Sequence, residues 1–174
     1  MYEMIPGDTF IPKLFWDIRD RITEKEGLHD CKPEEKVHDL LTLVLPGGEL
    51  TGHLDENEDD LIHMRFNLYI LTPPYSCETF YAGHPVETPE RTYAVCRSGI
   101  DLHWITKNET DIPRIAISYG YLMSKEMVEL KYPAATPTDS STALNEYEEK
   151  LYKFRTDMGF YEGDTGHWYT FKDD

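Results

Sequence analysis

LPGGELTGHLD, at residues 45–55, is the stretch that decides the fold, because a Pro-Gly-Gly turn runs there into a short segment of alternating character. Further short apolar or alternating segments follow: RFNLYIL (65–71), TYAVC (92–96), DLHWI (101–105) and RIAISYGYL (114–122). Breaks rich in Gly, Pro or Asn separate them. Many short strands at this spacing predict an all-β sandwich or barrel.

Two amphipathic segments flank this region. Residues 11–26 carry an apolar stripe that ends at Gly27, and residues 142–158 carry a second one that ends at Gly159, so both predict helices. We therefore expect a single domain over residues 1–174. Its expected parts are N-terminal helical support (1–38), a β core (39–123), a Pro/Ser/Thr linker (131–141), and a C-terminal helix and tail (142–174).

Charge and cysteine content narrow the class of protein. The 174 residues include 33 acids and 17 bases, a formal charge of −16 that repels phosphate backbones, so nucleic acid is a poor candidate partner. Cys31, Cys77 and Cys96 form no CxxC pair, which favours reduced thiols. The N-terminus lacks a signal-peptide pattern, and no apolar run is long enough to span a bilayer. We expect a cytoplasmic protein without a membrane segment.

His53 and Asp55 form an H-x-D in the deciding stretch. Residues i and i+2 of an extended segment point to the same face, so both side chains can chelate one metal ion. His103 lies in another strand-like segment and completes a set of two histidines and one carboxylate, the ligands of non-haem iron(II). Two alternatives remain open. An isolated H-x-D is more often a surface pair, and His103 can be a buried, hydrogen-bonded histidine beside Trp104.

RIAISYGYL places Arg114, Ala116 and Ser118 on one face of a strand and Ile115, Ile117 and Tyr119 on the other. An arginine fork and a hydroxyl that project into a barrel can bind a carboxylate. An arginine buried without an anion is costly, so an inward Arg114 implies an anionic partner. In the alternative, this face is exposed to solvent and Arg114 is a surface residue.

RFNLYIL has the same alternation. Arg65, Asn67 and Tyr69 share one face, and large apolar residues occupy the other. The polar face is either the exposed side of an edge strand or the wall of a polar cavity.

Taken in order, LPGG-x-L-x-x-H-x-D, RFNLYI, SG-x-x-x-H and PRIAISYGYL resemble the iron(II)/2-oxoglutarate-dependent oxygenase superfamily, in its prolyl-hydroxylase-like branch. The resemblance covers residues 40–123. It implies a mainly β fold with flanking helices, built on a double-stranded β-helix (a jelly-roll, cupin-like core).

The resemblance also implies roles for single residues. The iron ligands would be His53, Asp55 and His103, and the 2-oxoglutarate would be bound by Arg114, Ser118 and Tyr69. Arg65, Asn67 and Trp104 are candidates for contact with substrate. The sequence departs from the pattern at two places: Ser118 follows the arginine by four residues, and residues 75–79 replace a Gly-Gly pair.

The implied enzyme is a dioxygenase (hydroxylase) that uses iron(II), 2-oxoglutarate and O₂ to hydroxylate a C–H bond of a peptidyl or free amino acid or of a small metabolite, releasing succinate and CO₂. A metal-binding cupin-like protein without oxygenase activity and an acidic β-barrel interaction module are the alternatives. Residues 72–90 are either a substrate lid or an ordinary connection. The primary substrate and the oligomeric state are not readable from the sequence.

Overall fold

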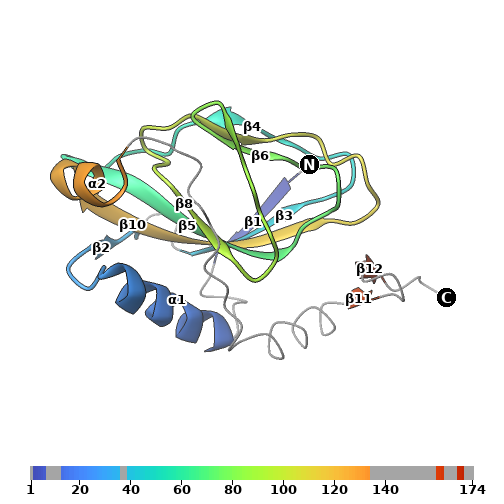
Figure 1. Ribbon diagram of the computed structural model, residues 1–174, viewed down its shortest axis with the longest axis horizontal. Helices are drawn as coiled ribbons and strands as arrows, with labels where there is room; N and C mark the ends of the chain where they lie inside the picture. Colours follow the sequence, from blue (N-terminus) through green and yellow to red (C-terminus); the bar gives the residue numbers. More distant parts are fainter. Residues whose placement is uncertain (1, 7–12, 36–38, 134–159, 163–167, 171–174) are drawn as a thin grey trace.

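The computed structural model describes residues 2–6, 13–35, 39–133, 160–162 and 168–170. Most of them belong to two antiparallel sheets and one long helix (Figure 1).

The larger sheet has the strand order β1-β3-β10-β5-β8, and a short sixth strand, β2, pairs with β10. The strands are β1 (Tyr2–Pro6), β2 (Lys32–Pro33), β3 (Leu40–Val44), β5 (Leu61–Leu71), β8 (Tyr93–Cys96) and β10 (Arg114–Ser124). The pairing of β10 with β5 extends from Ile115↔Leu71 to Ser124↔Leu61 with one bulge after Ile115, so these two long strands form the centre of the sheet.

The smaller sheet has the strand order β4-β9-β6-β7. Its strands are β4 (Leu50–His53), β6 (Thr79–Tyr81), β7 (His84–Val86) and β9 (His103–Ile105). From β3 to β10 the chain passes between the two sheets repeatedly: β3, β5, β8 and β10 lie in one, and β4, β6, β7 and β9 in the other. This course is that of a double-stranded β-helix, or jelly roll, so the predicted fold class is confirmed.

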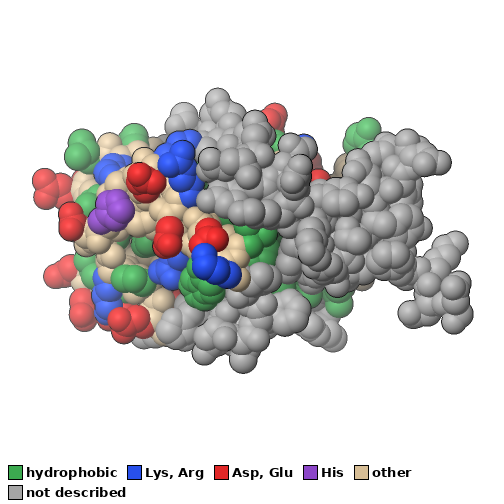
Figure 2. Space-filling view, turned by 90° about the horizontal axis from the view of Figure 1, so that it is seen from below, with side chains coloured by type: hydrophobic (Ala, Val, Ile, Leu, Met, Phe, Trp, Pro, Cys, Tyr) green, Lys and Arg blue, Asp and Glu red, His purple; other side chains and the backbone are tan. Residues whose placement is uncertain are grey.

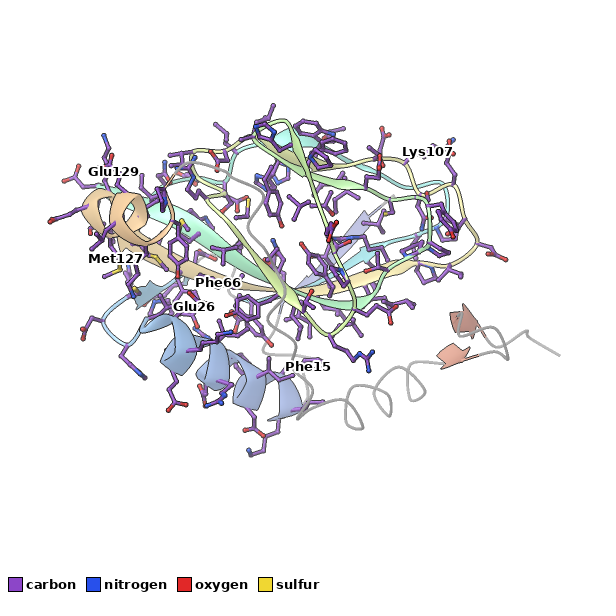
Figure 3. The ribbon with its side chains drawn as sticks, in the orientation of Figure 1. Phe15, Glu26, Phe66, Lys107, Met127 and Glu129 are labelled. Atoms are coloured by element: carbon purple, nitrogen blue, oxygen red, sulfur yellow. The ribbon has the colours of Figure 1, made fainter. Side chains whose placement is uncertain are left out.

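The main hydrophobic core lies outside the jelly roll. Helix α1 (Lys13–Glu26) packs on the outer face of the larger sheet, and Phe15, Ile18 and Ile22 are at most 1% exposed. Phe15 of α1 and Phe66 of β5 occupy the layer between helix and sheet (Figure 3). Burying each such side chain stabilises the fold by about 1.5–3 kcal/mol. The helix predicted over residues 11–26 is confirmed for its described part.

Strand alternation divides the larger sheet into an apolar and a polar face. The side chains of Phe66, Leu68 and Ile70 belong to the core beneath α1, as do those of Ile115, Ile117 and Tyr119. The residues between them, among them Arg65, Asn67, Arg114 and Ser118, line a cavity between the two sheets. The polar alternation in both strands therefore marks the wall of a cavity and not a solvent-exposed edge.

Several elements differ from the sequence expectations. Residues 72–90, considered as either a lid or an ordinary connection, contain β6 and β7, which are strands of the smaller sheet. Strands β1 and β2 and the short helix α2 (Lys125–Lys131) were not predicted. The predicted helix over 142–158 and most of the predicted linker lie outside the described residues. In the tail, β11 (Phe160–Glu162) pairs with β12 (Trp168–Thr170).

Figure 2 shows that acidic and basic side chains are interspersed on the described part of the face seen there. Among the helices that the structure describes, none is long and apolar enough to cross a membrane.

Candidate metal centre and carboxylate pocket

A cavity of about 270 Å³ lies between the two sheets. The smaller sheet contributes His53, Thr79, Tyr81 and His103 to its wall, and the larger sheet contributes Arg65, Asn67, Arg114 and Ser118. Polar side chains of both sheets therefore converge on one space.

His53, Asp55 and His103 meet on one side of this cavity. One ligand atom from each residue can be chosen so that all three lie within 4.8 Å of one another. Strand pairing explains the proximity, because His53 of β4 is the register partner of His103 of β9. The two imidazole centroids are 4.2 Å apart. Two imidazoles and one carboxylate on one side leave the opposite coordination positions of a metal ion open.

Backbone carbonyls orient both histidines. The Nδ1 atom of His53 lies 2.9 Å from the carbonyl oxygen of Thr51, and the Nδ1 atom of His103 lies 3.2 Å from that of Asp101. An Nδ1–H that donates to a carbonyl leaves Nε2 with its lone pair free for a metal ion. Both side chains are thus held in the tautomer that a metal ligand requires.

The turn before β9 supports the carboxylate and one histidine together. Arg97 donates two hydrogen bonds of 2.7 Å to Asp101, and these close the turn. The backbone N–H of Asp55 donates to the carbonyl oxygen of Ser98 (2.8 Å). Because Asp101 also accepts from His103, one turn fixes two of the three candidate ligands.

The electrostatics keep the candidate ligands in their metal-binding protonation states. Burial favours the protonated form of Asp55, but Arg65, a hydrogen bond from Ser98 and the neighbouring histidines outweigh it and lower its pKa. Burial, aided by His53, lowers the pKa of His103, so its imidazole is neutral near pH 7. A carboxylate and a neutral imidazole are the forms that bind a metal ion.

Arg114 is buried in the wall of the same cavity, with 3% of its surface exposed. Its Nη2 donates to the Thr79 hydroxyl (3.1 Å), and its Cζ lies 5.1 Å from the centroid of the Tyr69 ring. In the part of the chain that the structure describes, no carboxylate pairs with this guanidinium, and its buried Nε has no hydrogen-bond partner. A buried cation without a counterion is costly, so the site fits an anionic ligand.

Tyr69 lies beneath Arg114 and is fully buried, and it does not belong to the residues that line the cavity. Its hydroxyl is 3.2 Å from that of Tyr81, which does line the cavity and accepts a hydrogen bond from the Asn67 side chain (2.8 Å). Burial raises the pKa of both tyrosines, so both hydroxyls keep their protons and remain donors.

Ser118, Trp104 and Arg65, which the sequence assigned to the co-substrate or to the substrate, all line the cavity. Ser118 lines the cavity but is four residues, about 13 Å, along β10 from Arg114, and the hydroxyl beside Arg114 is that of Thr79. Trp104 is at the cavity wall and stacks on Phe80, with centroids 4.8 Å apart. Arg65 is directed to the carboxylates of Asp55 and Glu34.

Sequence reasoning did not assign several of the cavity residues to the site, among them Glu34, His63, Thr79 and Tyr81. His63 continues the alternation of Arg65 and Asn67 by one step, so extending RFNLYIL backwards would have found it. Thr79 and Tyr81 lie within residues 72–90, which were considered only as a connection or lid, and their strand β6 is too short to show a period. Glu34 lies in a polar segment without periodicity, and no signal in the sequence indicates it.

No protein-family model and no curated protein matches the chain. Solved structures are similar to it in fold. Prolyl-4-hydroxylase from Pseudomonas putida is 20% identical, with 71% of each chain covered and a TM-score of 0.45. The viral collagen prolyl hydroxylase of Paramecium bursaria Chlorella virus 1, solved with 2-oxoglutarate, is 15% identical over 71% of this chain and 96% of its own, also with a TM-score of 0.45.

HygX from Streptomyces hygroscopicus, solved with nickel, 2-oxoglutarate and hygromycin B, is 11% identical over 71% of this chain and 83% of its own, with a TM-score of 0.36. At these identities and TM-scores the similarity concerns the course of the backbone.

Proposed function

We propose that the chain is an iron(II)- and 2-oxoglutarate-dependent dioxygenase that hydroxylates a C–H bond of a peptidyl or free amino acid or of a small metabolite. Iron would be held by His53 Nε2, His103 Nε2 and a carboxylate oxygen of Asp55. When bound, iron(II) and 2-oxoglutarate would supply the oxidising chemistry with O₂, and the co-substrate would leave as succinate and CO₂.

One observation carries the proposal: a buried arginine, which no carboxylate of the described residues pairs with, lines the same cavity as the two histidines and the aspartate. A metal-binding β-barrel without a co-substrate has no need of such an arginine. A dicarboxylate satisfies both features, because one end can chelate the metal while the other pairs with the guanidinium.

The residues around Arg114 suit the carboxylate of the ligand that is distant from the metal. The guanidinium supplies a fork of N–H donors, and the Thr79 hydroxyl lies within hydrogen-bond distance of it. The buried ring of Tyr69 lies against Arg114, and the buried side chains of Tyr81 and Ile105 lie close by, so the local polarity at this end is low. Low local polarity strengthens a charged hydrogen bond, so the pocket can hold the distal carboxylate with few contacts.

Strand register supports a connection between the candidate metal ligands and this pocket. Thr79 pairs with Ile105 of β9, and Tyr81, two residues further on, pairs with the candidate ligand His103. Residues two apart on a strand are about 6.6 Å apart, a span that suits a small molecule reaching from Arg114 to the metal. Candidate ligands and carboxylate pocket are therefore neighbours in one sheet.

The experiment is an equilibrium binding measurement under anaerobic conditions. Protein loaded with Mn(II) is titrated with 2-oxoglutarate by calorimetry, and His103→Ala and Arg114→Met are compared with the exposed-histidine control His84→Ala. The proposal expects 2-oxoglutarate binding that requires the metal, His103 and Arg114 but not His84. Metal binding without 2-oxoglutarate binding would favour a cupin-like metal protein, and the absence of both would favour an interaction module.

A further inference from the structure

We propose that Glu34 acts through Arg65 to position Asp55, so that one carboxylate oxygen faces the metal while the other is held by the protein. This inference rests on the proposed function, because it assigns positioning residues to the same metal centre. Neither Glu34 nor the Glu34–Arg65 pair takes part in the contacts assigned above to metal or co-substrate.

The two oxygens of Asp55 have different surroundings. Oδ1 lies 3.7 Å from His53 Nε2 and so faces the other candidate ligands. Oδ2 lies 3.4 Å from Arg65 Nε and 3.9 Å from His63 Nδ1. Arg65 and His63 thus lie at one oxygen, whereas the other faces the candidate ligand His53, which favours monodentate binding of a metal ion.

Arg65 is shared between two carboxylates. Its Nη2 lies 3.6 Å from Glu34 Oε2, while its Nε is directed to Asp55. The side chains of Arg65 and Glu34 are only 7% and 5% exposed, so water screens this pair weakly. At 3.4 and 3.6 Å both contacts are longer than a tight charge-assisted hydrogen bond of about 2.8 Å. The guanidinium is therefore shared between Glu34 and Asp55.

Gly120 makes room for this arrangement. It is the register partner of Arg65 on β10, and its carbonyl accepts a hydrogen bond from the backbone N–H of Glu34 (3.1 Å). A Cβ at Gly120 would lie 2.8 Å from Arg65 Nη1 and 2.8 Å from Glu34 Cβ, closer than real Cβ contacts allow. Any side chain at this position would displace Glu34 or Arg65, so the arrangement of these two residues requires glycine at position 120.

The charge on Glu34 has a predictable effect on the metal site. With Glu34 present, Arg65 is partly neutralised and does not pair fully with Asp55. Without that charge, the guanidinium is drawn onto Asp55 and competes with the metal for the carboxylate. Mutating the outer-shell partners that orient a metal ligand typically weakens metal binding by about 10–100-fold. Glu34→Gln is therefore expected to weaken Mn(II) binding by about 10-fold.

The test is a double-mutant cycle on Mn(II) affinity, measured by the electron paramagnetic resonance of free Mn(II) without co-substrate. Glu34→Gln is compared with wild type, and the same change is then made in an Arg65→Met background. Because Glu34 acts through Arg65, its removal should change the affinity by less than about twofold in that background. The matched control is Glu58→Gln, which removes the carboxylate of the Lys32–Glu58 pair, an ion pair that does not include Asp55.

Gly120→Ala provides a second variant that leaves all charges unchanged and should also weaken Mn(II) binding. The visible spectrum of bound Co(II), which reports ligand geometry, should change in Glu34→Gln and in Gly120→Ala but not in Glu58→Gln. If Glu34→Gln fails to fold, Glu34→Asp enters the same cycle, with the same direction expected.

Equal effects of Glu34→Gln in both backgrounds would overturn the inference and leave the proposed function intact, as would wild-type affinity in Glu34→Gln. A wild-type protein that binds no Mn(II) would overturn both.

Discussion

Arg114→Met is expected to have opposite effects on ligand binding and on stability. The guanidinium is 3% exposed and lacks a carboxylate partner among the described residues. Truncating one member of a buried, hydrogen-bonded charge pair costs about 2–5 kcal/mol of binding free energy. The affinity for 2-oxoglutarate should therefore fall by about 30-fold to several-thousand-fold.

The free energy of unfolding of the ligand-free protein should rise in the same variant. Desolvation of an unpaired charge costs several kcal/mol. Here it is offset by one hydrogen bond to Thr79, worth about 1.5–3 kcal/mol, and by the contact with the Tyr69 ring, worth about 0.5–2 kcal/mol. Replacing the charge by an apolar chain should leave a gain of about 1–2 kcal/mol, or a Tm increase of roughly 2–8 °C for a domain of this size.

The assays are calorimetric titration of 2-oxoglutarate into Mn(II)-loaded protein and thermal unfolding of the metal-free protein. Arg97→Met is the matched control, because Arg97 is also shielded from solvent but makes two hydrogen bonds of 2.7 Å to Asp101. Its removal should lower the Tm. The reasoning is refuted if Arg114→Met binds 2-oxoglutarate within about threefold of wild type and unfolds at a lower temperature.

Three further predictions concern the metal, the pH and the core. Mn(II) should raise the Tm of wild type and of His84→Ala but not of His103→Ala, and an equal rise in all three would contradict the assigned ligands. Burial lowers the pKa of His63 and His103 below 6.5, so the unfolded chain binds more protons than the folded one as the pH falls through 6.5. The free energy of unfolding, measured by urea titrations at several pH values, should therefore decline below that pH, and it should decline less steeply in His63→Gln. If the decline with pH is equally steep in His63→Gln and in wild type, His63 does not contribute to the pH dependence. Phe15→Ala should lower the free energy of unfolding by about 3–5 kcal/mol, because it empties a site between α1 and the sheet, and a loss below about 1 kcal/mol would mean that the helix contributes little.

Strand alternation in the sequence predicts most of the architecture. In 65–71 and 114–122 every second residue is large and apolar, and those residues form the core beneath α1. The same alternation assigns Arg65, Asn67 and Arg114 to the opposite face, which is the cavity wall. Two long central strands with two-sided burial leave a strong periodic signal, because each face has its own chemical environment.

Shorter elements could not be predicted for physical reasons. The three-residue strands β6 and β7 contain too few residues to show a period, and their place depends on pairing with β9 and with each other. β2 is a two-residue strand held by long-range pairing with β10. Long-range pairing of this kind is a tertiary effect that local sequence does not encode.

The residues that line the cavity could also be predicted only in part from the sequence. Strand alternation in the sequence assigned Ser118 to the same carboxylate site as Arg114, but the rise of an extended strand separates their Cα atoms by about 13 Å, and the hydroxyl of Thr79 from the smaller sheet lies beside Arg114. Glu34 reaches the cavity because the preceding strand, β2, pairs with β10, and the sequence around it has no feature that predicts this. Contacts between the two sheets can be predicted only when the fold is known, whereas the face that a residue occupies within one strand can be predicted from the sequence.

The most direct test of the account is whether one cavity binds iron and 2-oxoglutarate together. Under anaerobic conditions, iron(II) and then 2-oxoglutarate are added to the protein, and the visible spectrum is followed for the weak charge-transfer band of a keto acid chelated to iron. The account predicts a band in wild type that is absent in His103→Ala and in Arg114→Met. A wild-type protein that binds both ligands without the band, or a band that survives both substitutions, would contradict it.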